Sequence, residues 1–325
     1  MFALRGIAVS SSVFVLVYGV LSFAVCFAWR SLWLSFQKYP ARRIADWLFT
    51  LRIVPFVSAW VITAVFAVPS FLLLEPRTIE EPVGAVPFAL GLCGLGLGIF
   101  GAVNAMLATR RASRAIAGWT RQAQPVETKS KAESIRLSVS VPVLRIAKSF
   151  PAMIATGITR PRILVSGAAE LRLSSRELQT ALNHEVEHVR RRDNLKKLLM
   201  RFVAFPGMSG LEAAWLEATE MAADDAAVAN ASEALDLASA LIKLSRMGAV
   251  ESPVDLTAAL LHTPASVVNA RVERLIAWSD ERRTPATTHR SLYGMGAILA
   301  MLLAFAVSYS QLLVQIHSAT EWLMR

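Results

Sequence analysis

Residues 174–194, SSRELQTALNHEVEHVRRRDN, form the stretch that decides how this chain folds. Ser174 and Glu177 have the spacing of a capping box, in which the serine accepts from a helix amide and the glutamate reaches back to the cap. Apolar residues then recur with a helical period from Leu178 onward. We therefore predict one helix of about six turns that begins at this capping box and ends before Pro206.

The same helix carries two histidines four residues apart, His184 and His188. Residues i and i+4 lie on one face of a helix, so both imidazoles can bind one metal ion. Glu185 lies about 100° around the helix from His184, which suits it to act as a base on water rather than as a ligand. Glu187 points away from the histidines and is interpreted as a surface residue or salt-bridge partner. The layout is typical of a zinc hydrolase; the alternative is two incidental histidines on a surface helix.

A third ligand is expected because catalytic zinc typically takes three protein ligands. The pattern is helical again from Ser209, and this second helix carries several acidic residues. Glu220 is the favoured ligand, because Asp224 lies one turn further on the same face and can accept from the far N–H of a ligand histidine. Glu217 is the alternative ligand.

Four long stretches are nearly free of charge, and each exceeds the roughly 20 residues that a helix needs to cross a bilayer. Hydrophobic residues make up 54% of the 325-residue chain and charged residues only 18%, which is unusual for a soluble domain. We predict a mainly α-helical membrane protein with four transmembrane helices and an α+β domain between the third and fourth. The expected spans are about 7–29, 53–74, 83–109 and one within 291–325. A cleaved signal peptide is the alternative for the first span, but its length argues for a retained helix.

Basic residues set the expected orientation. They cluster between spans one and two and flank the long segment 110–290, whereas the loop between spans two and three is acidic. The positive-inside rule then places the amino terminus outside and segment 110–290 in the cytosol, with the protein in the inner (plasma) membrane. Contact with the anionic inner leaflet accounts for the net charge of +10, so no direct binding of nucleic acid is expected.

The third span is rich in glycine, and Gly94 and Gly98 have the spacing that lets helices approach closely. Packing against another span of the same chain is the default interpretation, and a homodimer through this span is the alternative. Both cysteines, Cys26 and Cys93, fall within spans, so neither a disulfide framework nor a cysteine metal site is expected.

Within the cytosolic segment, residues 110–133 are predicted to form a basic juxtamembrane connector with one short helix. Residues 134–290 then form the metal-binding domain. Short strands are expected at 135–141, 152–156 and 163–165, leading into the helix that carries the histidines.

Four segments carry a resemblance to a known family: PRILV at 161–165, LQTAL at 178–182, HEVEHVRRRDN at 184–194 and EMAADD at 220–225. They resemble the membrane metallopeptidases of the BlaR/MecR antirepressor type, which are gluzincins related to the heat-shock and prenyl-protein membrane proteases. The resemblance covers most of the chain, including four spans with a gluzincin-like domain in the third loop. It implies the following roles: zinc ligands His184, His188 and Glu220, general base Glu185, and ligand-supporting carboxylates Asp224 and Asp193.

Two features depart from that family. Ala223 stands where the family usually has cysteine, which brings the segment closer to the heat-shock type. BlaR/MecR receptors also continue after the fourth span into an extracellular penicillin-binding sensor, whereas only a short tail follows here, so we do not expect β-lactam sensing by this chain alone. His262, ahead of Thr263 and Pro264, resembles a histidine-proline segment of the heat-shock and prenyl-protein relatives. We predict it as a further catalytic residue; a surface histidine is the alternative.

The predicted activity is Zn²⁺-dependent hydrolysis of peptide bonds in a cytosolic or membrane-associated protein, with a transcriptional repressor as one candidate substrate. The alternative is a non-catalytic membrane transducer or scaffold that keeps the fold. The intact Glu185 and the complete ligand set favour the peptidase, because a scaffold would not need the base.

Overall fold

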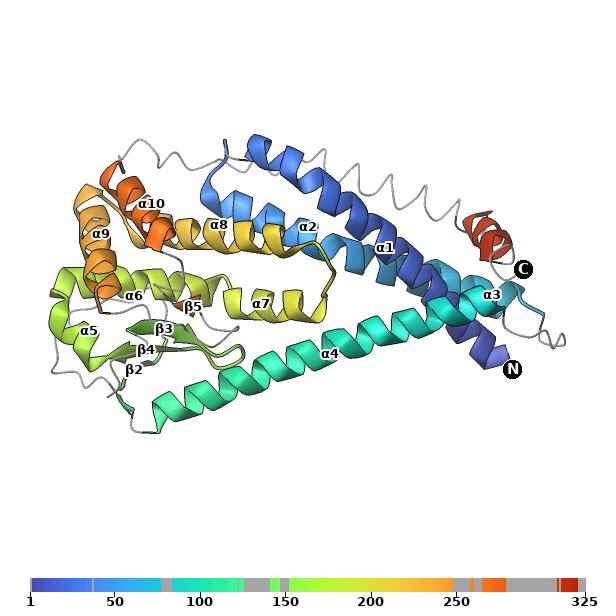
Figure 1. Ribbon diagram of the computed structural model, residues 1–325, viewed down its shortest axis with the longest axis horizontal. Coiled ribbons are helices and arrows are strands. Elements are labelled where there is room, and N and C mark those ends of the chain that lie inside the picture. Colours follow the sequence, from blue (N-terminus) through green and yellow to red (C-terminus); the bar gives the residue numbers. More distant parts are fainter. Residues whose placement is uncertain are drawn as a thin grey trace. The chain divides into compact units, whose positions relative to one another are not determined.

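We analysed a computed structural model of the chain (Figure 1). The structure describes residues 2–36, 38–76, 84–121, 123–125, 141–146, 152–247, 258–259, 265–278, 309 and 311–320. The chain divides into two compact units. One, the helical unit, comprises 1–30, 51–100 and 284–325, and the other, the sheet-containing unit, comprises 31–50 and 101–283.

Within the described ranges, three helical stretches are long and apolar enough to cross a membrane: Phe2–Ser31, Ala41–Leu74 and Ala85–Thr120. The first lies in α1 (Phe2–Phe36) and the third is α4 (Ala85–Thr120). The second consists of α2 (Ala41–Ile62), the π-helical turn η1 (Thr63–Ala67) and α3 (Val68–Leu74). Among the described residues, the first three predicted spans are thus helices long and apolar enough to cross a membrane.

The helices extend beyond the charge-free stretches because a charged residue ends the apolar segment but not the helix. α4 continues through the basic residues 110–120, so the start of the predicted connector is the end of this helix and not a separate one. Most of the predicted fourth span lies outside the described residues; Tyr309 and residues 311–320 are helical.

Within the helical unit, the glycine-rich face of α4 packs against α1. A Cβ atom added at Gly94 would lie 3.0 Å from Val15 Cγ2, and one added at Gly91 would lie 3.5 Å from Ala8 Cα. A Cβ added at Gly98 would meet nothing within 4 Å. The default interpretation, packing within one chain, therefore accounts for Gly91 and Gly94, and the homodimer stays a prediction.

The sheet of the second unit has the strand order β1-β2-β4-β3-β5. Its strands are β1 (Gln124–Pro125), β2 (Val143–Ile146), β3 (Met153–Thr156), β4 (Arg162–Ser166) and β5 (Ala258–Ala259). β3 and β4 pair antiparallel after a turn at Gly157, whose φ of +87° suits glycine, and β2 pairs parallel with β4. The strands predicted at 152–156 and 163–165 are confirmed, whereas most of the strand predicted at 135–141 lies outside the described residues.

In the described part of this unit, six further helices follow the strands or lie between them: α5 (Gly167–Arg172), α6 (Ser175–Arg190), α7 (Asp193–Phe202), α8 (Ser209–Ala227), α9 (Ala231–Ser245) and α10 (Ala265–Ile276). The capping box at the start of α6 is confirmed, with Ser174 N–H donating to Glu177 Oε2 at 2.7 Å and Glu177 N–H donating to Ser174 Oγ at 3.3 Å. The prediction of a single helix of about six turns is wrong. Arg192 adopts the left-handed conformation, with φ of 55° and ψ of 41°, and separates α6 from α7.

The start of α2 belongs to the sheet-containing unit. Residues 31–50 cluster with this unit, and Ala45 and Leu48 are fully buried. The ring of Phe49 lies 6.4 Å from that of the buried Trp215 on α8, and Lys196 on α7 lies over the same phenylalanine ring. This apolar contact joins a membrane helix to the two helices that follow the histidine motif.

Candidate metal centre

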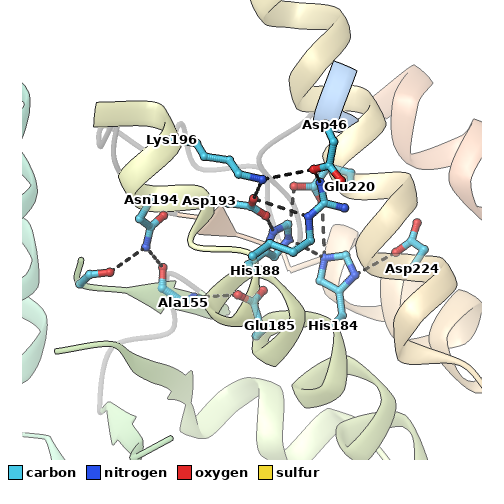
Figure 2. A network of polar contacts seen from close by, with 12 residues as sticks. Asp46, Ala155, His184, Glu185, His188, Asp193, Asn194, Lys196, Glu220 and Asp224 are labelled. Atoms are coloured by element: carbon cyan, nitrogen blue, oxygen red, sulfur yellow. Dashed lines mark hydrogen bonds and ion pairs between the residues drawn. The ribbon is translucent and has the colours of Figure 1, made fainter. Parts of the chain in front are cut away.

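Three side chains converge beside the sheet: His184 and His188 from α6, and Glu220 from α8 (Figure 2). The two Nε2 atoms are 3.1 Å apart. Glu220 Oε2 lies 3.5 Å from His184 Nε2, and Glu220 Oε1 lies 3.6 Å from His188 Nε2. All three residues are buried, and one ligand atom from each lies within 4.8 Å of the others. Glu217, the alternative ligand, is exposed and lies outside this cluster.

A carboxylate supports the far side of each imidazole. Asp224 Oδ1 lies 3.0 Å from His184 Nδ1, and Asp193 Oδ2 lies 2.8 Å from His188 Nδ1. The contact between His184 and Asp224 is a close ion pair whose N–H is not aligned for a regular hydrogen bond. Both contacts favour the proton on Nδ1, so the lone pairs of both Nε2 atoms face into the cluster.

The cluster therefore requires positive charge at its centre. Two imidazole nitrogens and a carboxylate, all acceptors, face one another, and only a proton or a cation between them can satisfy all three. A borderline-soft ion such as Zn²⁺ prefers this combination of two histidines and one carboxylate. The residues present thus fit a metal ion.

The pKa values of His184 and Glu220 also indicate that the cluster favours positive charge. Burial lowers the pKa of His184, but the carboxylates of Asp224 and Glu220 outweigh burial and raise it to about 9. Burial raises the pKa of Glu220, but the positive charges of Arg271 and the histidines lower it to about 2. The centre stabilises positive charge next to an ionised carboxylate, which is the state in which a metal ion can replace the proton.

Glu185 lies on the same helix but is held by the sheet. The backbone N–H of Ala155 on β3 donates to Glu185 Oε2 at 2.7 Å, and the side chain is fully buried. Oε1 has no hydrogen-bond partner among the described residues. Burial raises the pKa of Glu185. A carboxylate with one oxygen held by a hydrogen bond, the other without a partner and a raised pKa is suited to accept a proton.

The break between α6 and α7 positions Asp193. Because Arg192 is left-handed, the chain turns and α7 begins with Asp193 beside His188. A single straight helix would place residues 188 and 193 about 140° apart around its axis. Asn194, the next residue, donates to the carbonyl oxygens of Ala155 and Gly157 at 3.2 and 3.3 Å and so fixes α7 to β3.

Glu187 is buried, not on the surface, because other helices pack around α6. The predicted salt bridge is present, with Arg190 Nη1 3.4 Å from Glu187 Oε2. His262 lies outside the described residues, so its role stays a prediction. A cavity of about 490 Å³ opens beside His188 and is bounded by the β3–β4 turn and the start of α7.

Sequence reasoning assigned no role in the centre to Arg271 or Asp46. Arg271 of α10 contacts both Glu220 and Asp224. Asp46 of α2 lies 3.5 Å from both Arg191 Nη2 and Lys196 Nζ, which lie close to Asp193 (Figure 2). The acidic pair 224–225 and the basic pair 271 and 274 were a charge pattern that could have indicated the α8–α10 contact.

Comparison with protein families gives one match. The sequence model of a family described as BlaR1 peptidase M56 matches residues 84–275, more than half of the chain. The chain belongs to the BlaR1 peptidase M56 family. The resemblance stated from the sequence is thereby confirmed, and the M56 match contains all members of the metal cluster together with Glu185. Comparison with curated proteins gives no match. Membership of the M56 family and the apolar helices together indicate a membrane metallopeptidase.

Proposed function

We propose that this protein is an integral-membrane zinc endopeptidase that hydrolyses peptide bonds in a cytosolic or membrane-associated protein. The observation that carries the proposal is the buried Glu185, whose Oε1 has no hydrogen-bond partner among the described residues, beside three side chains that could hold a metal ion. A protein that only binds a partner has no need of this arrangement.

His184, His188 and Glu220 would hold the ion, and the chemistry that Zn²⁺ supplies when bound is Lewis acidity towards a carbonyl oxygen and a water molecule. Asp224 and Asp193 orient the imidazoles and keep the Nδ1 protons in place. Glu185 Oε1 accepts the proton of the attacking water while Ala155 N–H holds Oε2. Glu185 then returns that proton to the amine leaving group, which regenerates the carboxylate for the next turnover.

Charge and hydropathy support the location in the inner membrane, with the metal centre on the cytosolic side. The basic residues at the end of α4 and around Arg43 are those that the positive-inside rule retains in the cytosol. A transcriptional repressor is the substrate class that the relationship to BlaR1 favours.

The test is the Glu185→Gln variant of the full chain, purified in detergent and loaded with zinc. We expect cleavage of casein or of a candidate repressor to fall by about 100-fold or more, because a positioned base contributes that much, while zinc content is unchanged. Glu187→Gln is the matched control: it changes the neighbouring glutamate of the motif and should leave cleavage near the wild-type rate.

Cleavage that persists in Glu185→Gln would contradict the mechanism. A wild-type protein that binds zinc but cleaves no substrate would favour the second candidate, a non-catalytic transducer or scaffold.

A further inference from the structure

A buried arginine lies behind the metal centre. Arg271 of α10 is only 2% exposed, and its guanidinium meets two acidic residues of α8. Nη1 donates to Glu220 Oε2 at 2.9 Å, Nε donates to Asp224 Oδ2 at 2.8 Å and Nη2 donates to Asp224 Oδ1 at 2.6 Å. Arg271 thus binds both Glu220, the expected third ligand, and Asp224, the carboxylate beside His184.

The positive charge of Arg271 offsets the repulsion between the carboxylates of Glu220 and Asp224. Glu220 and Asp224 lie one turn apart on one helix, where like charges repel, and both are buried. A guanidinium offers five N–H donors in a rigid plane, so it can bind one carboxylate with two bonds and still reach the other. A lysine would carry the same charge but could not hold both carboxylates in fixed orientations.

The geometry also determines which atoms remain available to a metal ion. Glu220 Oε2 is occupied by Arg271, whereas Oε1, 3.6 Å from His188 Nε2, receives no hydrogen bond from that arginine. Asp224 Oδ1 is shared between Arg271 and His184 Nδ1. Arg271 therefore constrains the rotation of Glu220 and, through Asp224, the ring of His184.

We propose that Arg271 is a positioning residue of the metal centre, which sets the orientation of Glu220 and His184 without binding the metal or the substrate. The inference rests on the proposed zinc site. It makes α10 a structural part of that site, although none of the expected ligands lies on α10.

The chain contains a matched control. Arg274 lies three residues later on α10 and binds Asp225 of α8, next to Asp224 in the sequence, with its Nη2 2.5 Å from Asp225 Oδ2. Both side chains of this second pair are partly exposed, and Asp225 is outside the metal cluster. Removing Arg274 therefore tests the loss of α8–α10 contacts outside the metal cluster, namely this ion pair and a hydrogen bond to the Met221 carbonyl oxygen.

The experiment compares Arg271→Gln, Arg271→Lys and Arg274→Gln in the full chain purified in detergent. Zinc affinity is measured by competition with a chromophoric chelator, and the ligand arrangement is read from the visible spectrum of the Co²⁺-loaded protein. Thermal unfolding without metal reports folding separately. We expect Arg271→Gln to weaken zinc binding by about 10–100-fold, as is typical when a group supporting a ligand is lost, and to shift the Co²⁺ spectrum.

Arg271→Lys should recover only part of the affinity, and Arg274→Gln should match the wild type in both readouts. If Arg271→Gln does not fold, Arg271→Lys decides alone, because it keeps the buried charge. Wild-type affinity and an unchanged Co²⁺ spectrum in a folded Arg271 variant would overturn the inference. Failure of the wild type to bind zinc would instead contradict the proposed function.

Discussion

The two imidazoles of the centre are each held by a carboxylate from a different helix. Asp224 of α8 supports His184, and Asp193 of α7 supports His188. Neither carboxylate is accessible to solvent, so water cannot replace it as a partner. The orientation of each ring is therefore determined by the packing of its neighbouring helix against α6.

At this scale we predict the effect of removing Asp193. Asp193→Ala leaves His188 Nδ1 without an acceptor, and zinc affinity should fall by about 10–100-fold. Asp193→Asn should lose less, because the amide oxygen can still accept from Nδ1 but carries no charge. Chelator competition measures both, and Glu217→Gln on the exposed face of α8 is the control. Equal affinities for Asp193→Ala and wild type would refute the role of this contact.

At the level of the helices, the start of α6 is held by Glu177, which makes two sets of contacts. Glu177 completes the capping box with Ser174 and also accepts hydrogen bonds from Lys243 at 2.6 Å and Ser239 at 2.5 Å, both on α9. The contact fastens the beginning of the histidine-bearing helix to α9. Burial raises the pKa of Glu177, but hydrogen bonds from Lys243, Ser239 and Ser174 outweigh it and lower the pKa to about 2.

This lowered pKa predicts a pH dependence of stability. Because the folded-state pKa lies below the ordinary value of 4.5, the ionised Glu177 stabilises the fold fully above about pH 4.5 and loses this effect as pH falls towards 2. Glu177→Gln should therefore lower the free energy of unfolding by about 1 kcal/mol or more at pH 7, the size of a lost cap. The difference from wild type should shrink between pH 4.5 and pH 2.

Unfolding in detergent, followed by tryptophan fluorescence across this pH range, measures the difference. Glu233→Gln is the control, since Glu233 occupies the equivalent capping position of α9 but is only partly buried. A wild-type advantage that stays constant from pH 7 to pH 2 would show that the charge of Glu177 plays no part.

Local sequence signals predicted some elements and missed others. The capping box at Ser174 is visible because its hydrogen bonds join residues three apart. The break at Arg192 is not, because three consecutive arginines are good helix formers and nothing local demands a left-handed residue. β1 and β5 are two residues each, too short for an alternating pattern, and exist only by pairing with their neighbours.

At the scale of the whole molecule, α2 belongs to both units. Its first part, up to Thr50, is assigned to the sheet-containing unit, and its remainder to the helical unit. Leu48 is fully buried, and Asp46 approaches Arg191 and Lys196 beside the metal centre. A helix apolar enough to cross a membrane is thus also a packing element of the sheet-containing unit.

We predict that Leu48→Ala destabilises this unit by about 2–5 kcal/mol, the usual cost of removing a fully buried leucine side chain. Hydrogen–deuterium exchange of the full chain should show faster exchange in α7 and α8. Val57→Ala is the control, because Val57 lies on the same helix but is 47% exposed. Unchanged exchange in Leu48→Ala would mean that the start of α2 is only a tether.

The sequence by itself determined the apolar helices, the capped helix and the two histidines with their glutamate. These depend on composition, on spacing along one helix and on hydrogen bonds between near neighbours, which the order of residues states directly. Tertiary structure brought Glu220, rather than Glu217, to the two histidines, brought Asp193 to His188 through the turn at Arg192, and placed Arg271 beside Glu220 and Asp224. Those contacts join residues that are distant in the chain or separated by a helix break, so only the packing of α7 and α8 against α6, and of α10 against α8, creates them.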